Sequence, residues 1–140
     1  LGPIALYPPD PEVAELMNRI GYVVQVEDED RFYALWSLTA LMAPYFALLG
    51  TTTEWLIKKG IDKPAAKQYV GSMFAGLSAF GTEIRSNDFV ALIREHQTPG
   101  GLNEQALKEL RQSDWYASVE KILDVIQDRL QGNSTYVAKD

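Results

Sequence analysis

The sequence changes its pattern at Glu27, and this change limits the fold more than any other feature. Before it, Gly2–Tyr7 and Tyr22–Val26 are short runs with the apolar, β-branched and aromatic composition of buried strands. Between them, Asp10 followed by Pro11 predicts the start of a helix, because aspartate favours the cap position and proline the first turn. The opening segment is therefore expected to be a β-α-β piece.

After Glu27 the apolar residues recur at helical spacing, and no further strand-like run follows. A long helix is expected from about Asp28 to Lys59, with a kink or break just before Pro44, because a mid-helix proline lacks a donor and clashes with the preceding turn. Further helices are expected over 62–81, over 88–95 with Ser86, Asn87 and Asp88 at its cap, from about 102, and over 115–130 with Ser113 or Asp114 as its cap. The sequence thus predicts a mainly α fold in three segments: a β-α-β remnant of a larger domain at 1–28, a helical domain at 29–131 and a flexible tail at 132–140.

The composition excludes several kinds of site. The 140 residues include no cysteine and one histidine, which leaves no thiolate site, no cysteine nucleophile and no histidine-based metal cluster. A formal net charge of -6 disfavours nucleic acid and anionic membrane surfaces as partners, because a basic patch that could release counterions is missing. No glycine-rich phosphate loop of either common spacing occurs, so we expect the chain alone to bind no dinucleotide.

Two features of the sequence concern the cellular compartment of the protein. The most apolar stretch, Ala34–Leu49, is interrupted by Ser37, Thr39 and Pro44 and is flanked by charges, which favours a buried helix over a membrane span. The chain opens directly on a strand-like run, without the charged and apolar regions of a secretory signal. We therefore expect a cytoplasmic protein without a membrane partner.

Two groups of titratable side chains have plain structural explanations. The acidic run Glu27–Asp30 lacks the spacing and the glycine of a calcium loop, and it favours a solvated helix start. His96 falls at the predicted end of a helix, where its ring can donate to a free carbonyl. A general acid or base role is the alternative for His96, which lies two residues before a proline-glycine-glycine loop; no catalytic residue is assigned.

The loop that precedes Leu102 is the strongest candidate for a binding site. Its adjacent glycines, Gly100 and Gly101, let backbone approach a ligand, and the helix that follows presents free N–H groups to an anion. With the Thr98 hydroxyl, Leu102 at the helix start and the Asn103 amide, they would form a small cradle for a carboxylate. The alternative is an ordinary turn between helices in which Asn103 is the capping residue.

Small side chains gather on the helix predicted to follow Asp62. Gly71, Ala75, Gly76 and Ala79 give it a face that permits close helix contact. Together with three tryptophans, the helices carry more apolar surface than one small core needs, and the surplus indicates a subunit interface. Two-fold pairing is the commonest arrangement, so a homodimer is expected.

Three pieces of the sequence are together similar to a known family: Leu6–Pro11, Ala43–Phe46 and Thr98–Gly101. They resemble the C-terminal part of pyrroline-5-carboxylate reductase over residues 1 to about 130, and the proline-glycine-glycine piece is the most specific. The resemblance implies the last β-α-β piece of a Rossmann domain followed by a helical dimerisation domain, with the nucleotide-binding half upstream. The chain would then be a fragment of a longer protein.

In that family two helical domains interlock, and a loop of the form Ser/Thr-Pro-Gly-Gly-x-Thr holds the substrate carboxylate beside the nicotinamide of NAD(P)H. By this resemblance Thr98, Gly100 and Gly101 match the loop, and Asn103 stands where the family has threonine. The family segment Ser-Gly-Ser-Gly-Pro-Ala-Tyr corresponds to residues 40–46, where the proline and a nearby aromatic remain. The resemblance implies an oxidoreductase that reduces a C=N bond, in proline biosynthesis or on a related imine or keto acid, with NADH or NADPH bound by the full-length protein.

Three functions remain open on the sequence alone. The first is the dimerisation and substrate-binding part of such a reductase, with a small carboxylate as substrate. The second is a non-catalytic helical homodimerisation module, motivated by the replaced serines and glycines near Pro44. The third is a free-standing adaptor that binds a partner helix in an apolar groove. The first two differ in whether Thr98 and Asn103 contact a ligand.

Overall fold

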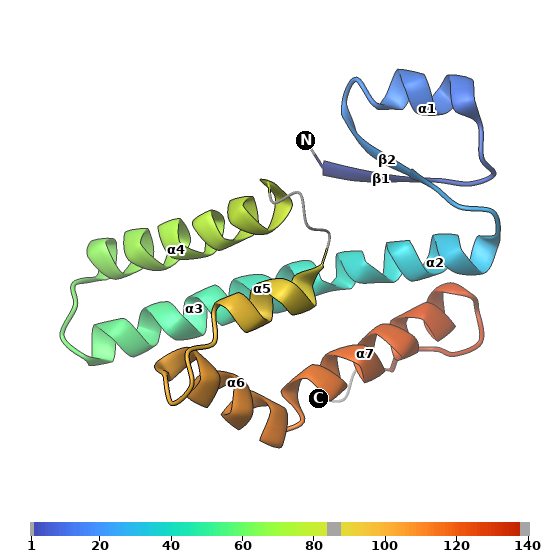
Figure 1. Ribbon diagram of the computed structural model, residues 1–140. Coiled ribbons are helices and arrows are strands. Elements are labelled where there is room, and N and C mark those ends of the chain that lie inside the picture. Colours follow the sequence, from blue (N-terminus) through green and yellow to red (C-terminus); the bar gives the residue numbers. More distant parts are fainter. Residues whose placement is uncertain (1, 84–87, 138–140) are drawn as a thin grey trace. The chain divides into compact units, whose positions relative to one another are not determined.

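The computed structural model describes residues 2–83 and 88–137 of the chain (Figure 1). The chain divides into two compact units: Leu1–Met42 with Ala117–Asp140, and Ala43–Tyr116. Each unit is described by itself. The first contains the strands and the last helix, and the second contains the helices that carry the proline-glycine-glycine loop.

The first unit opens on the predicted β-α-β piece. Strand β1 (Gly2–Leu6) pairs in parallel with β2 (Gly21–Gln25), and α1 (Pro11–Met17) connects them. Asp10 caps α1 because its carboxylate accepts from the N–H groups of Glu12 and Val13, both at 3.0 Å. Gly21 lies so close to β1 that a Cβ atom there would be 2.6 Å from the Gly2 carbonyl oxygen. Position 21 therefore needs glycine for the strands to pair.

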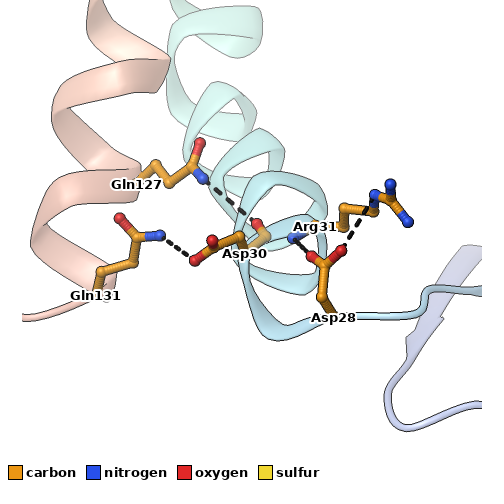
Figure 2. Close-up of polar contacts among 5 residues, drawn as sticks. All are labelled: Asp28, Asp30, Arg31, Gln127 and Gln131. Carbon is orange, nitrogen blue, oxygen red and sulfur yellow. Dashed lines mark hydrogen bonds and ion pairs between the residues drawn. The ribbon is translucent and has the colours of Figure 1, made fainter.

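The predicted helix start at the acidic run and the predicted break before Pro44 are both confirmed. Helix α2 (Glu29–Ser37) begins at Asp28, whose carboxylate accepts from the Arg31 N–H at 2.8 Å (Figure 2). A short 3-10 helix (Leu38–Leu41) separates α2 from α3 (Met42–Lys58). Pro44 is thus the third residue of α3, where its missing N–H costs no helical hydrogen bond.

The C-terminal helix returns to the start of α2. Helix α7 (Trp115–Leu130) has its residues from Ala117 onward in the first unit. Near its end, the Gln131 side-chain nitrogen donates to the Asp30 carboxylate at 2.8 Å, and the Gln127 side-chain nitrogen donates to the Asp30 carbonyl at 3.3 Å (Figure 2). Tyr136 lies in the predicted flexible tail, and the Arg129 guanidinium of α7 is 5.4 Å from the centre of its ring. Part of this tail therefore contacts α7.

The second unit is helical throughout its described residues, with α3, α4 (Lys63–Glu83), α5 (Phe89–Glu95) and α6 (Leu102–Gln112). The Asp62 carboxylate accepts from the Ala65 N–H at the start of α4, and Asp88 accepts from the Val90 N–H at the start of α5. The predicted capping residues Ser86 and Asn87 lie outside the described residues. Helix α4 continues two residues beyond the predicted end at Gly81.

The predicted cap of α7 needs a correction. Ser113 caps the end of α6, where its hydroxyl donates to the Leu110 carbonyl at 2.9 Å. Asp114, between the two helices, has a φ of 55°, in the left-handed region that interrupts a helix. Ser113 therefore terminates one helix, and the prediction that it could start the next is wrong.

The buried core of the chain is small. Among the residues whose burial is described, the buried side chains are Ala14, Ser37, Ala66 and Val70. Large apolar side chains are widely exposed; Trp55 is 57% exposed and Phe46 67%. Exposed apolar surface on this scale is uncommon in a soluble monomer.

By length and composition alone, the helical stretch Glu29–Lys58, with a mean hydropathy of 1.5, meets the requirement for crossing a membrane. Core helices of water-soluble proteins meet the same requirement. The stretch is also interrupted by the 3-10 helix at Leu38–Leu41. That the chain has no membrane partner stays a prediction.

Candidate functional site

The candidate loop joins α5 to α6 and forms a tight turn. The Gly101 N–H donates to the Thr98 carbonyl at 2.8 Å, which closes the turn around Pro99 and Gly100. Gly100 has a φ of 74°, as the third residue of a type II turn requires. A Cβ atom on Gly101 would lie 2.9 Å from the Thr98 carbonyl oxygen. Both glycines are therefore needed, Gly100 for its backbone conformation and Gly101 for space.

The loop brings the predicted binding residues together at the first turn of α6. Gly101 is the cap residue, with an extended backbone, and its carbonyl accepts from the Gln105 N–H at 3.1 Å. Leu102 follows and is 84% exposed. The Asn103 side-chain nitrogen donates back to the His96 carbonyl at 3.1 Å. Asn103 is thus the second residue of the helix, and the alternative that makes it the capping residue is wrong.

Glu104 is the residue at this loop that sequence reasoning missed. One oxygen of its carboxylate accepts from the Gly100 N–H at 2.8 Å, and the other lies 3.0 Å from the Lys108 ammonium. The Gly100 N–H and, to a lesser extent, Lys108 hold the pKa of the Glu104 carboxyl below its ordinary value. The signal for this contact was present in the sequence, because an acidic residue three positions after the cap is the pattern of a capping box.

His96 takes the predicted structural role. It follows the last residue of α5 as the C-cap, and its Nδ1 atom lies 2.8 Å from the Leu92 carbonyl oxygen. In the tautomer that carries the proton on Nδ1, the ring donates to a helix carbonyl as predicted, but this carbonyl is not free because it also accepts from the His96 backbone N–H at 3.1 Å. The ring also meets Phe80 of α4 edge to face, with 5.5 Å between centres. A general acid or base role for His96 stays a prediction.

A hollow of about 280 Å³ lies beside the loop. It is lined by the two loop glycines and by polar side chains of α6: Glu104, Gln105, Lys108, Glu109 and Gln112. Its wall is polar and carries one cation between two carboxylates. A small polar ligand can therefore reach the loop backbone from this side.

A second, larger hollow of about 630 Å³ belongs to the first unit. It is apolar and lies between the strands and the segment from α2 to Met42, lined by Pro3, Ile4, Ala5, Val24, Phe32, Leu35, Trp36, Leu38, Thr39 and Met42. Two of these residues, Phe32 and Trp36, meet edge to face with 6.1 Å between ring centres. The apolar character of this wall agrees with the bulky residues that occupy the 40–46 segment.

The four residues predicted for a dimer interface are all exposed on α4. They are Gly71, Ala75, Gly76 and Ala79. At 3.6 residues per turn, the face made by Gly71, Ala75 and Ala79 is roughly opposite to the buried Ala66 and Val70. A Cβ atom built on Gly71 or on Gly76 meets nothing within 4 Å. Among the described residues, nothing in the chain thus lies against the Cβ positions of Gly71 and Gly76 on this helix.

The order of elements is that of a mainly α dimerisation domain preceded by a short β-α-β unit. Residues 29–132 match the model of the pyrroline-5-carboxylate reductase dimerisation family. The chain therefore belongs to this family, as the resemblance implied. A comparison with curated protein sequences finds no match.

Solved structures share this fold. A pyrroline-5-carboxylate reductase from Coxiella burnetii superimposes with a TM-score of 0.76 at 22% identity, over 96% of this chain and 52% of that one. A pyrroline carboxylate reductase from Plasmodium falciparum, solved with NADP bound, gives 0.73 at 13% identity, over 94% of this chain and 53% of that one. The chain thus spans about half the length of these two proteins.

Proposed function

We propose that this chain is the dimerisation and substrate-binding part of an NAD(P)H-dependent reductase that acts on the C=N bond of a small carboxylate-bearing imine. The observation that carries the proposal is the loop at residues 98–104, set at the start of α6 in a member of this family. Its glycine backbone, the Thr98 hydroxyl and the Asn103 amide are the groups that would bind the carboxylate. Chains of this family supply position and electrostatics for such a reaction more than covalent chemistry.

The β1–α1 connection of this chain does not fit a nicotinamide dinucleotide. This connection, Tyr7–Asp10, has prolines where a phosphate-binding turn has glycines. The start of α1 is also already occupied by a negative charge, the Asp10 carboxylate, where a pyrophosphate would otherwise approach. We therefore assign no cofactor-binding residue here, and NAD(P)H belongs to the remainder of a full-length protein.

A homodimer is part of this proposal. The exposed small-residue face of α4 and the small buried core both support pairing with a second copy through close helix contact. Obligate interfaces of this kind bury about 2,000 Å² or more and replace part of the core. Such a chain is expected to unfold when it is separated from its partner.

A non-catalytic dimerisation module is the second candidate, and one observation favours it. Three donors of the loop already have acceptors within the chain: the Gly100 N–H, the Gly101 N–H and the Asn103 amide. A loop that had lost its ligand would be satisfied internally in this way. The two candidates differ in whether a carboxylate displaces these contacts.

The deciding experiment is an assay of the full-length protein for oxidation of NADH and NADPH with pyrroline-5-carboxylate and with other cyclic imino acids. The matched variant is Thr98→Val, which keeps the shape of the side chain and removes its hydroxyl. We expect turnover in the natural protein and a raised KM in the variant, because a hydrogen bond to a charged group contributes about 1.5–3 kcal/mol. Absence of turnover, together with a stable dimer, would favour the non-catalytic module.

A further inference from the structure

The Glu104 carboxylate is bound to a loop backbone N–H that the proposed function assigns to a ligand carboxylate. Its Oε2 atom accepts from the Gly100 N–H at 2.8 Å, and its Oε1 atom is 3.0 Å from the Lys108 Nζ atom. A ligand carboxylate would make the same two kinds of contact, with a backbone N–H and with an ammonium group. The loop as it stands is therefore bound to an anion that belongs to its own chain.

We propose that Glu104 is an intramolecular competitor for the substrate carboxylate, bound to the Gly100 N–H in the free protein and displaced from it when substrate binds. This inference rests on the proposed function, since it concerns the same loop. It assigns a regulatory role to a residue outside the matched loop motif, and it explains how a loop with internally satisfied donors can still receive a ligand.

The geometry allows Glu104 to leave without becoming an unpaired buried charge. Its side chain is 26% exposed, and the Lys108 side chain is 63% exposed and lies one turn further along α6. When Glu104 releases the Gly100 N–H, its other oxygen can stay with Lys108. Release thus costs one charge-assisted hydrogen bond, and an incoming carboxylate restores that bond at Gly100.

Competition by Glu104 also determines which ligands can bind to the loop. A neutral ligand group cannot replace the charge that Glu104 places on the Gly100 N–H, whereas a carboxylate can. Binding at this loop is therefore expected to require an ionised acid on the ligand. An amide of the same ligand is the natural negative probe, because it keeps the shape and loses the charge.

The test measures binding of L-proline, the pyrrolidine carboxylate that reduction of a pyrroline carboxylate produces, to the full-length protein by calorimetry. Glu104→Ala removes the competitor. Glu54→Ala, on α3 of the same unit, removes an equal charge from an exposed side chain that lines neither hollow. If Glu104 occupies the Gly100 N–H about nine-tenths of the time, Glu104→Ala will lower the Kd about tenfold. Glu54→Ala is expected to leave the Kd unchanged, and prolinamide is expected not to bind the natural protein.

A second readout keeps the proposal testable if Glu104→Ala does not fold. Glu104→Gln keeps an oxygen for the Gly100 N–H but loses the charge, so its Kd should fall between those of the natural protein and Glu104→Ala. The amide resonance of Gly100 in a proton–nitrogen NMR spectrum reports the contact directly. It should shift in Glu104→Gln without ligand, and it should shift in the natural protein when L-proline is added.

Each other outcome overturns the proposal in a distinct way. Equal tightening in the Glu104 and Glu54 variants would show a general charge effect without competition. Weaker or unchanged binding in both Glu104 variants would make Glu104 a structural cap and leave the proposed function intact. Failure of L-proline to bind the natural protein and every folded variant would overturn the proposed function, and the competitor with it.

Discussion

The Gln131 side-chain nitrogen donates to the Asp30 carboxylate at 2.8 Å and so joins two residues that are 101 positions apart in the sequence (Figure 2). Asp30 lies in the first turn of α2, and Gln131 follows the last residue of α7. The bond therefore links the first helix of the matched domain to its last. Asp28 and Arg31 form an ion pair beside it at 3.3 Å, but that pair is well exposed and adds little stability.

The first prediction concerns this link. Gln131→Ala removes a hydrogen bond to a charged acceptor and is expected to lower the free energy of unfolding by about 0.5–1.5 kcal/mol, as measured in urea. Gln131→Glu places a second carboxylate against Asp30, so it should destabilise more at pH 7 and recover on acidification. A glutamate variant as stable as the natural protein at pH 7 would show that the bond does not form in solution.

The second prediction concerns the buried alanine of α4. Ala66 is 0% exposed, and Ala66→Leu is expected to lower the free energy of unfolding by about 1–3 kcal/mol because the larger side chain has no room. The control is Ala106→Leu, at an exposed helical position on α6. It should change stability by about 0.5 kcal/mol or less. Equal effects of the two substitutions would mean that Ala66 is not packed as described.

Helix starts were predictable because their causes are local. Asp10, Asp28, Asp62 and Asp88 each accept from an N–H group two or three residues ahead, and such spacing can be read directly from a sequence. The end of α4 was less predictable. Gly81 stops a helix only when nothing favours its continuation, and here it packs against the Phe89 ring of α5.

The candidate site was predictable in its backbone but not in its side-chain contacts. Gly100 and Gly101 are required by the turn itself, so their pattern carried the information. Only the alternative role of Asn103 as the cap of α6 was wrong, because a single amide near a helix start can bond forward or backward, and the position of the His96 carbonyl decides between them. The Asp30–Gln131 bond was not predictable, since it depends on how two distant helices pack.

The third prediction is a pH dependence that originates at Glu104. Its pKa in the folded chain lies below the ordinary value of 4.5, chiefly because of the Gly100 N–H and then Lys108. A lowered folded-state pKa means that the contact stabilises fully above about 4.5, and that this stability is lost as the pH falls through the lower value. Between pH 7 and pH 3 the Tm of the natural protein should therefore fall further than the Tm of the Glu104→Gln variant.

The control for this pH series is Glu109→Gln, which removes the same charge from the next turn of α6. Its Tm should fall in parallel with that of the natural protein. Parallel curves for all three proteins would contradict the prediction, because the Glu104 carboxylate would then have the same pKa in the folded and unfolded states.

The last prediction separates the proposed dimer from the fold of a single chain. Gly76→Leu places a large side chain at the edge of the α4 face made by Gly71, Ala75 and Ala79, where a Cβ atom on Gly76 meets nothing within 4 Å. Leucine also favours a helix over glycine by about 0.8–1 kcal/mol, so the substitution should not disturb α4. A partner helix packed closely on this face would be pushed away. Sedimentation velocity is therefore expected to show a weakened dimer for Gly76→Leu and an intact one for Gly76→Ala, while an intact dimer in both would place the interface on another face.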